Sequence, residues 1–131
     1  MIIFQTGEPD VHATAAVRAA QASRQQTTVA NRDGGAIHPA IHVNIGISSG
    51  VCEVGATRLH GAAGERWTFT ASGPVTNLAA RLSDHADDGQ IFLTSETARR
   101  VCDRFPVRSL GPISLKNLPS PVEVWEVQGV R

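Results

Sequence analysis

The chain has 131 residues, a length that suits a single domain with a core of useful size. Its 12 acidic and 12 basic side chains balance, so its charge gives no electrostatic reason to bind nucleic acid or an anionic membrane surface. No apolar run is long enough to span a bilayer, and the N-terminus lacks the basic and apolar segments of a signal peptide. Cys52 and Cys102 lack the CxxC spacing of a metal site and are expected to be reduced thiols. Together these features favour a cytoplasmic globular protein.

The N-terminal part of the chain predicts a strand followed by a long helix. Met1–Phe4 is a short apolar run typical of the end of a strand. Asp10 is the expected N-cap of an alanine-rich helix that continues to about Arg32. The small side chains of this helix would allow close packing on a sheet, and its polar second half would project past the core. Gly34 and Gly35 are expected to end the helix.

The following segment predicts a hairpin. Apolar residues alternate with polar or small ones over Ile41–Ile47, which indicates a strand with one buried face. Ser49 and Gly50 are expected to turn this strand back into a second strand over residues 51–55. A glycine-containing loop over residues 56–66 would then lead to the next element.

Residues 67–86 show the pattern of a strand, a tight turn and a helix. Apolar and hydroxyl side chains alternate up to Ser72, Gly73 permits the turn, and Pro74 suits the first turn of a helix. Asn77 and Arg81 are four residues apart and therefore share one face of that helix. An amide and a guanidinium side by side can hold an anion, although an ordinary solvated helix face has the same pattern. The residues expected to form the buried stripe are Val75, Leu78, Ala79, Leu82 and Ala86.

The rest of the chain alternates short strands with one more helix. A turn is expected over residues 87–89, and Ser95 is the expected N-cap of a helix that continues to about Asp103. The expected strands cover residues 90–93, 107–110, 113–115 and 122–127. This order of elements indicates an α+β or α/β fold with helices packed on a sheet.

Three patterns that could indicate other chemistry have simpler explanations. His38 and His42 have a spacing that suits zinc on a helix, but four residues of a strand span about 13 Å. The glycines of residues 46–55 lack the lysine of a phosphate-binding loop and do not begin a helix. Three aspartates, at positions 84, 87 and 88, lie near the end of a predicted helix, which favours turn and capping roles over a metal cluster.

Taken in order, these segments resemble the class III nucleotidyl cyclases, that is, the catalytic domain of adenylate and guanylate cyclases. Ile45–Gly55 is similar to the glycine-marked hairpin of the family, and Phe69–Leu82 is similar to its signature strand and helix. Residues 88–95, 110–117 and 121–125 match its closing segments. The resemblance implies a ferredoxin-like α+β sandwich with a mostly antiparallel sheet and helices packed on it. It also implies that residues 1–131 form a single, partial cyclase domain.

The family converts a nucleoside triphosphate into a 3′,5′-cyclic nucleotide and pyrophosphate, helped by two Mg²⁺ or Mn²⁺ ions at a site between two subunits. By resemblance, Asn77 would orient the ribose, and Arg81 would stabilise the charge that builds on the α-phosphate. Lys116 matches the lysine that holds the terminal phosphates. Thr70 lies at the base-reading position, where bacterial adenylate cyclases often carry threonine, so the resemblance favours ATP over GTP. The simpler alternatives are that Thr70 is only a strand residue and that Lys116 is only a solvated one.

The resemblance also implies what this chain does not supply. Met1–Phe4 aligns with the strand after the second metal aspartate of the family, so neither metal aspartate has a counterpart here. The base-reading lysine, the first strand and the helices that follow it have none either. The chain alone is therefore expected to lack cyclase turnover with ATP and Mn²⁺, and its exposed sheet edges would favour a dimer or a strand-exchanged assembly.

Two classes of function follow, and a third reading explains the missing segments as a truncated sequence. The chain could be half of an enzyme, in a homodimer or in a heterodimer with another cyclase domain. It could instead be a non-catalytic cyclase-homology module that binds nucleotide or a partner and regulates it. A start codon upstream of Met1 would make the sequence a fragment of an ordinary cyclase.

Overall fold

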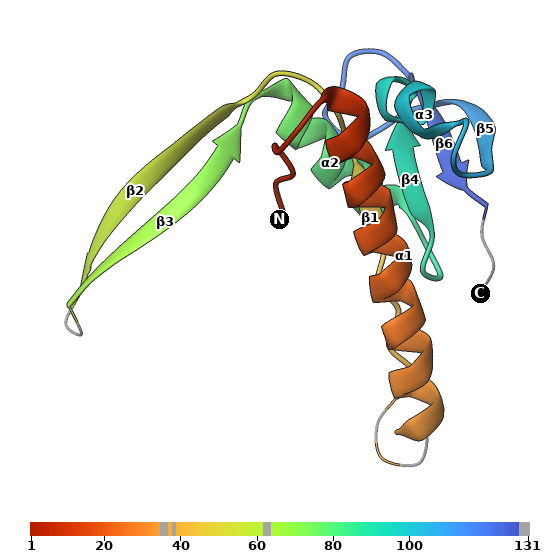
Figure 1. The fold of residues 1–131 in the computed structure, drawn as a ribbon, viewed down its shortest axis with the longest axis horizontal. Coiled ribbons are helices and arrows are strands. Elements are labelled where there is room, and N and C mark those ends of the chain that lie inside the picture. The colour runs from red at the N-terminus through yellow and green to blue at the C-terminus, as the bar shows by residue number, and fades with distance from the viewer. Residues whose placement is uncertain (35–36, 38, 62–63, 129–131) are drawn as a thin grey trace.

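The computed structural model describes residues 1–34, 37, 39–61 and 64–128, and for residues 57–60 and 65–70 only the backbone is considered. These described residues form three helices and six strands (Figure 1). The helices are α1 (Pro9–Asp33), α2 (Pro74–His85) and α3 (Ser95–Val101). The strands are β1 (Ile45–Ile47), β2 (Glu53–Gly61), β3 (Gly64–Ser72), β4 (Ile91–Thr94), β5 (Val107–Ile113) and β6 (Val122–Val127). None of the described helices has the length and apolar character needed to cross a membrane.

The body of the molecule is a four-stranded sheet in the order β1-β4-β6-β5. The β1–β4 pair is parallel, whereas β4–β6 and β5–β6 are antiparallel. Alternate residues of β4 enter different cores: Ile91 and Leu93 pack in a cluster with α1 and α3, and Phe92 packs in a cluster with α2. Helices therefore cover both faces of the sheet, which confirms the α+β class and the mostly antiparallel sheet.

Helix α1 packs on the sheet through its first half only. Its buried residues, Ala13, Thr14, Val17 and Ala20, all lie in the first half, and the second half extends beyond the sheet, as expected (Figure 1). The N-cap is Glu8, and Asp10 lies inside the first turn, so the prediction that Asp10 caps the helix is wrong. The reason is that Pro9 can take the first helical position, where its missing N–H is not needed. Gly34 is the C-cap, as predicted, and Gly35 lies outside the described residues.

Of the first two strand predictions, the first is wrong and the second is partly correct. Met1–Phe4 forms no strand, because no neighbouring strand offers it hydrogen bonds. Of the strand expected over Ile41–Ile47, only the last three residues belong to β1. At Ile41, the side chain of Asn31 takes the place of a strand partner. Asn31 Nδ2 donates to Ile41 O at 2.6 Å, and Ile41 N donates to Asn31 Oδ1 at 2.7 Å.

The hairpin predicted between residues 41–47 and 51–55 does not form. β1 pairs instead with β4, with Ile45 opposite Ile91, and β2 pairs antiparallel with β3 over nine positions. Residues 56–61 and 64–66, which were predicted to be loop, therefore belong to the strands of this hairpin, which we call the ribbon (β2 and β3). The ribbon extends away from the body (Figure 1). Residues 53–61 lack the regular alternation of apolar residues, so periodicity gave no strand signal there.

Smaller differences occur near the C-terminus. Thr94, not Ser95, is the N-cap of α3, because its hydroxyl accepts a hydrogen bond from Thr97 N at 3.4 Å. Helix α3 ends at Val101 rather than near Asp103. β5 is one strand with an irregularity between Ser109 and Gly111, where two strands were predicted. The strands over β4 and β6 and the turn before β4 are confirmed.

Candidate active-site face on helix α2

Helix α2 follows the ribbon after a single glycine. Gly73 has a φ of 117°, a backbone conformation that other residues rarely adopt, and Pro74 takes the first helical turn. The N–H of Asn77 donates to Gly73 O at 3.1 Å and closes that turn. The sequence prediction of a turn at Gly73 and a helix from Pro74 is confirmed.

The core face of α2 fixes the rotation of the helix. Leu82 is fully buried and Ala86 is 4% exposed, and both pack with Phe92, Leu115 and Val124. Leu78 packs against the same cluster as a partly buried residue. The predicted buried stripe is therefore confirmed at these three positions, whereas Val75 and Ala79 are half-buried and line a groove on another side of the helix.

Close backbone contact also holds α2 on β1. A Cβ atom added at Gly46 would lie 2.3 Å from Ala79 O and 2.6 Å from Ser83 N. No side chain could occupy that space, so the helix backbone rests directly on the strand. This contact makes α2 a firm support for the side chains on its remaining face.

Asn77 and Arg81 lie together on the outward face of α2. Successive helical residues are separated by about 100°, which places Asn77, Arg81 and Asp84 on the side away from the core residues. Asn77 is exposed, and its amide makes no hydrogen bond with any described residue. Among the described side chains, the Arg81 guanidinium reaches Asp84 alone, at 3.5 Å, and 33% of the Arg81 side chain is exposed. Both polar groups are thus available to a ligand or to another protein.

Lys116 lies in a turn that packs beside α2. Leu115 is 5% exposed and belongs to the core of α2, and Leu118 packs against the same core. The turn is closed by Leu118 N, which donates to Leu115 O at 3.2 Å, and Asn117 takes a positive φ of 65° within it. Lys116 itself is exposed, and no contact joins it to Asn77 or Arg81 among the described residues.

The backbone of Thr70 lies in β3, opposite Gly55 of β2. The side chain of Thr70 lies outside the part of the chain whose side chains the structure describes. The base-reading role of Thr70 therefore stays a prediction.

The donor groups on this face do not fit a two-metal site. Within the described residues, no group of three or more His, Cys, Asp or Glu side chains could hold a metal ion. The carboxylate nearest to the pair, that of Asp84, already faces the Arg81 guanidinium. Mg²⁺ and Mn²⁺ prefer several oxygen ligands, which the outward face of α2 does not offer.

Among the described residues, a carboxylate with a lowered pKa lies elsewhere, on α3. Arg99 donates hydrogen bonds to the Glu96 carboxylate, and Arg100 forms a second ion pair with it. The hydrogen bond from Arg99, with the attraction of both guanidinium groups, lowers the pKa of Glu96 below its ordinary value. This pair is exposed, so it stabilises the end of the short helix and has no evident part in a reaction.

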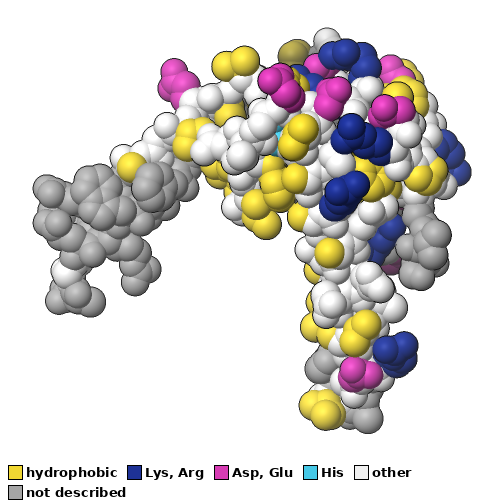
Figure 2. Space-filling view, in the orientation of Figure 1, with side chains coloured by type: hydrophobic (Ala, Val, Ile, Leu, Met, Phe, Trp, Pro, Cys, Tyr) yellow, Lys and Arg dark blue, Asp and Glu magenta, His cyan; other side chains and the backbone are white. Residues whose placement is uncertain are grey.

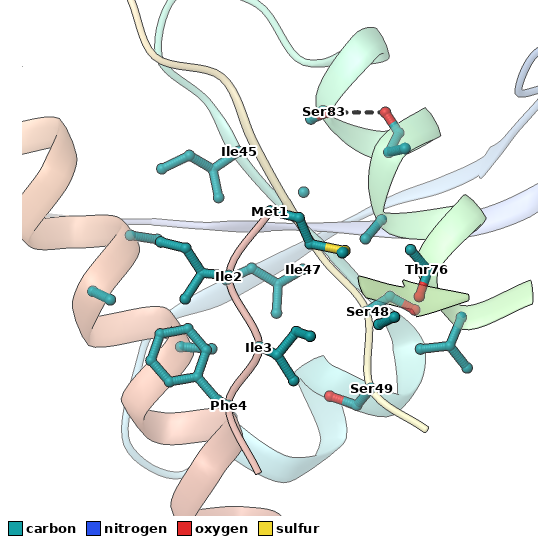
Figure 3. Close-up of a pocket in the computed structure, with 18 of the residues that line it drawn as sticks. Met1, Ile2, Ile3, Phe4, Ile45, Ile47, Ser48, Ser49, Thr76 and Ser83 are labelled. Atoms are coloured by element: carbon teal, nitrogen blue, oxygen red, sulfur yellow. Dashed lines mark hydrogen bonds between the residues drawn. The ribbon is translucent and has the colours of Figure 1, made fainter. Parts of the chain in front are cut away.

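Two cavities lined by described residues also lie away from Asn77 and Arg81. One, of about 580 Å³, lies between the N-terminus, α1, β1 and α2 (Figure 3). The other, of about 630 Å³, lies between the second half of α1 and residues 41–43. Neither is lined by Asn77, Arg81 or Lys116.

A model of one protein family, the adenylate and guanylate cyclase catalytic domain, matches residues 1–129 of the chain. The chain belongs to this family. The cyclase resemblance noted in the sequence is confirmed, with a match that spans nearly the whole chain.

Two curated relatives are receptor-type adenylate cyclases from trypanosomes. The Trypanosoma congolense protein is 29% identical over 96 residues, which are 69% of this chain and 12% of that protein. GRESAG 4.2 of Trypanosoma brucei brucei is 27% identical over 94 residues, which are 69% of this chain and 15% of that protein. The chain thus spans only a small part of the length of these relatives.

Solved cyclase structures have the same fold. The adenylyl cyclase CyaB from P. aeruginosa superposes with a TM-score of 0.84 at 29% identity, covering 97% of this chain and 64% of that one. The guanylyl cyclase Cya2 superposes with a TM-score of 0.74 at 25% identity, covering 98% of this chain and 64% of that one. This cyclase domain therefore resembles an adenylyl and a guanylyl cyclase, and spans just under two thirds of each solved chain.

Proposed function

We propose that this cyclase domain supplies the Asn77 and Arg81 half of a site that converts ATP into 3′,5′-cyclic AMP and pyrophosphate. The observation that supports this most is the outward face of α2, where an amide and a guanidinium lie side by side without a cavity of their own. Such a pair becomes part of a pocket only when a second cyclase domain covers it, in a homodimer or a heterodimer.

In the proposed reaction, the ribose 3′-oxygen attacks the α-phosphorus in line with the leaving pyrophosphate. A bond forms between the 3′-oxygen and phosphorus, and the bond from phosphorus to the oxygen that bridges the α- and β-phosphates breaks. Pyrophosphate leaves with that oxygen, and the proton of the 3′-hydroxyl passes to solvent. Negative charge builds on the α-phosphate oxygens, and Arg81 donates hydrogen bonds to them. Asn77, one turn earlier, hydrogen-bonds to the ribose and holds the 3′-oxygen in line.

Two further residues complete the substrate contacts of this half. Lys116 would bind the terminal phosphates as a point charge, from the turn that Leu115 and Leu118 hold against the core of α2. Thr70 would recognise adenine. Among the residues of this half, Thr70 is the one on which we base the choice of ATP over GTP, because the fold is shared with both kinds of cyclase. A Thr70→Ala variant that keeps its full preference for ATP would contradict that assignment.

We assign no reaction step of this chain to a metal ion. Divalent ions, when bound, supply positive charge at the phosphates and activate the attacking oxygen. The described residues do not fit such a site, so we propose that its carboxylates belong to the partner domain. In keeping with this, purified chain alone should form no cyclic AMP from ATP and Mn²⁺, and robust turnover would refute the half-site proposal.

Complementation of a defective cyclase tests the proposal directly. The partner is the CyaB cyclase domain with alanine at the two positions that align with Asn77 and Arg81, and the readout is cyclic AMP formed from ATP. We expect the mixture to be active and the Arg81→Ala chain to restore at least 100-fold less activity, the usual cost of removing one such donor. Arg18→Ala is the matched control, because Arg18 is an exposed arginine on another helix.

The alternative is a non-catalytic cyclase-homology module that binds nucleotide or a partner and regulates it. The absence of a metal donor set among the described residues favours this second function. It predicts that ATP binds to the chain, or to its complex with CyaB, while the mixture stays inactive. Equal rescue by the Arg81→Ala and Arg18→Ala chains would exclude the half-site without supporting the module.

A further inference from the structure

A cavity of about 630 Å³ lies where α1 leaves the sheet. Ala20 is the last residue that α1 buries in the core, and the α1 residues that line the cavity all follow it. The opposite wall consists of residues 41–43 and of the turn that contains Asp88 and Gly89. No residue before Gln21 takes part in the lining. The cavity is therefore formed by the projecting half of α1 and by the part of the body that faces it.

Hydrogen bonds join the walls of this cavity at two places. Toward the end of α1, the Asn31 side chain binds both backbone groups of Ile41, at 2.6 and 2.7 Å. Near the sheet, Gly89 N donates to Asn44 Oδ1 at 3.0 Å. The walls therefore keep their spacing without a ligand, and a cavity that is already formed lowers the cost of binding.

The side of α1 that faces the cavity continues the core face of the helix but differs from it in character. One row of residues, at intervals of three or four, runs along this side: Ala13, Val17, Ala20, Arg24, Thr28 and Asn31. The first three are buried in the core, whereas the last three line the cavity. Because the side chains of one row point the same way, α1 directs polar groups into the cavity.

Arg24 is the charged group of the α1 wall. It is the one charged residue among positions 21–31, and uncharged side chains cover most of the projecting half of α1 in Figure 2. Arg24 is half-buried, and its Cδ would lie 4.0 Å from a Cβ atom added at Gly89 on the opposite wall. Its guanidinium makes no hydrogen bond or ion pair with any described residue. A half-buried guanidinium without a partner favours an anionic group in the cavity.

The opposite wall supplies a negative charge. Asp88 has a positive φ of 51°, and its N–H donates to Asp87 Oδ1 at 3.0 Å. The Asp88 carboxylate has no hydrogen bond or ion pair within the described part of the chain. Asp88 and Arg24 line the same cavity, yet no ion pair joins them. Both charges are therefore available to a ligand.

We propose that this cavity binds a small zwitterion that carries a carboxylate and an ammonium group, the chemistry shared by free amino acids and short peptides. Arg24 donates two parallel hydrogen bonds to the carboxylate, and Asp88 accepts hydrogen bonds from the ammonium group. The side-chain amides of Gln21 and Gln25 line the same wall as Arg24 and hydrogen-bond to the remaining polar atoms of the ligand. A ligand with one charge would leave the opposite group of the cavity unpaired, which weakens binding.

Two probes with blocked forms test the recognition of both charges. The probes are L-alanine and trialanine, and each is also titrated with its ammonium group acetylated or with its carboxylate converted to an amide. By isothermal titration calorimetry with the purified chain, the tighter probe should bind with a Kd of about 1 mM or lower. Each of its blocked forms should bind about tenfold more weakly or worse. Tighter binding of L-alanine assigns the site to free amino acids, and tighter binding of trialanine assigns it to peptides.

Substitution of the charged residues shows which group binds each end of the probe. In Arg24→Gln, the free and amidated probes should bind equally, because the carboxylate has lost its partner. In Asp88→Asn, the free and acetylated probes should bind equally for the corresponding reason. Arg32→Gln and Asp103→Asn are the matched controls, because both residues are exposed and lie outside the cavity lining. Both controls should bind the probes as the wild type does.

Three results would overturn the inference. Failure of both probes to bind at millimolar concentration would mean that the cavity holds water alone. Equal binding of free and blocked probes to the wild type would exclude recognition of the two charges, and this comparison needs no variant to fold. Equal losses in the variants and their controls would place the binding elsewhere. The proposal does not rest on the half-site function, because these measurements involve no cyclic AMP and neither Asn77 nor Arg81 lines the cavity.

Discussion

The body and the ribbon of this molecule differ in how their strands are supported. Strands of the body are short, with β1 only three residues long, yet both faces of their sheet are covered by helices. Strands of the ribbon are nine residues long and pair only with each other. Two paired strands that pack on no other element are marginally stable in water. Hydrogen bonds between strands alone therefore do not explain the stability of the body. We therefore expect the burial of apolar side chains between the sheet and helices α1, α2 and α3 to supply most of the stability of the body.

The sharpest test of this difference is one substitution made in both regions. Gly46→Ala in β1 brings a methyl group against Ala79 O and Ser83 N, both backbone atoms, whereas Gly55→Ala in β2 meets nothing within 4 Å. We expect Gly46→Ala to lower the free energy of unfolding by about 3 kcal/mol or more and Gly55→Ala by less than about 0.5 kcal/mol, measured by urea unfolding. Similar losses would show that α2 does not rest on β1 as described.

The second test removes apolar volume from each region. Leu82 of α2 is fully buried, whereas Val54 of the ribbon is 43% exposed. Leu82→Ala should cost about 2–5 kcal/mol of stability, because it leaves a cavity in the core. Val54→Ala should cost less than about 0.5 kcal/mol. A large loss at Val54 in thermal unfolding would mean that the ribbon is packed against something in solution.

A smaller, pH-dependent effect is expected on α3. The folded-state pKa of Glu96 is lowered by Arg99, so the unfolded state binds the proton more tightly. Its contribution to stability is therefore present above the ordinary pKa of 4.5 and is lost as the pH falls through the lower, folded-state value. Wild type should be more stable than Glu96→Gln at pH 7, and the difference should vanish in acid. A difference that does not change with pH would contradict this origin.

The smallest expected effect on stability is at the outward face of α2. Asp84 is the only described partner of the Arg81 guanidinium, at 3.5 Å, and such exposed pairs contribute little. Arg81→Ala should change the free energy of unfolding by less than about 0.5 kcal/mol while removing rescue of the defective CyaB domain. A loss of stability as large as that of Leu82→Ala would mean that Arg81 has a structural role instead.

Helix α2 and strands β4 and β6 could be predicted from the sequence because their signals are local. Gly73, Pro74 and the spacing of Leu78, Leu82 and Ala86 determine where α2 begins and which face it buries. Helix starts at Asp10 and Ser95 were misplaced by one or two residues, because several neighbouring residues can cap a helix.

The partner of each strand could not be predicted in the same way. Ile45 pairs with Ile91, which is far along the chain, and alternation over Ile41–Ile47 gives no information about that partner. The strand predicted over residues 67–72 lies in β3, whereas the length of β2 and its pairing with β3 could not be predicted, because residues 53–61 do not alternate regularly with period two. Spacing alone left Asn77 and Arg81 as an ordinary helix face, and only the family resemblance singled them out with Thr70 and Lys116.

The direct passage from β3 into α2 has a mechanical consequence. Ser72 ends the ribbon, Gly73 is the single residue between, and the N–H of Asn77 is tied to Gly73 O. The ribbon is therefore joined directly to the first turn of α2. Further along, the helix backbone at Ala79 and Ser83 is in close contact with Gly46 of β1. A force applied at the far end of the ribbon bears first on the turn that carries Asn77, and reaches Arg81 only through the part of the helix in contact with β1.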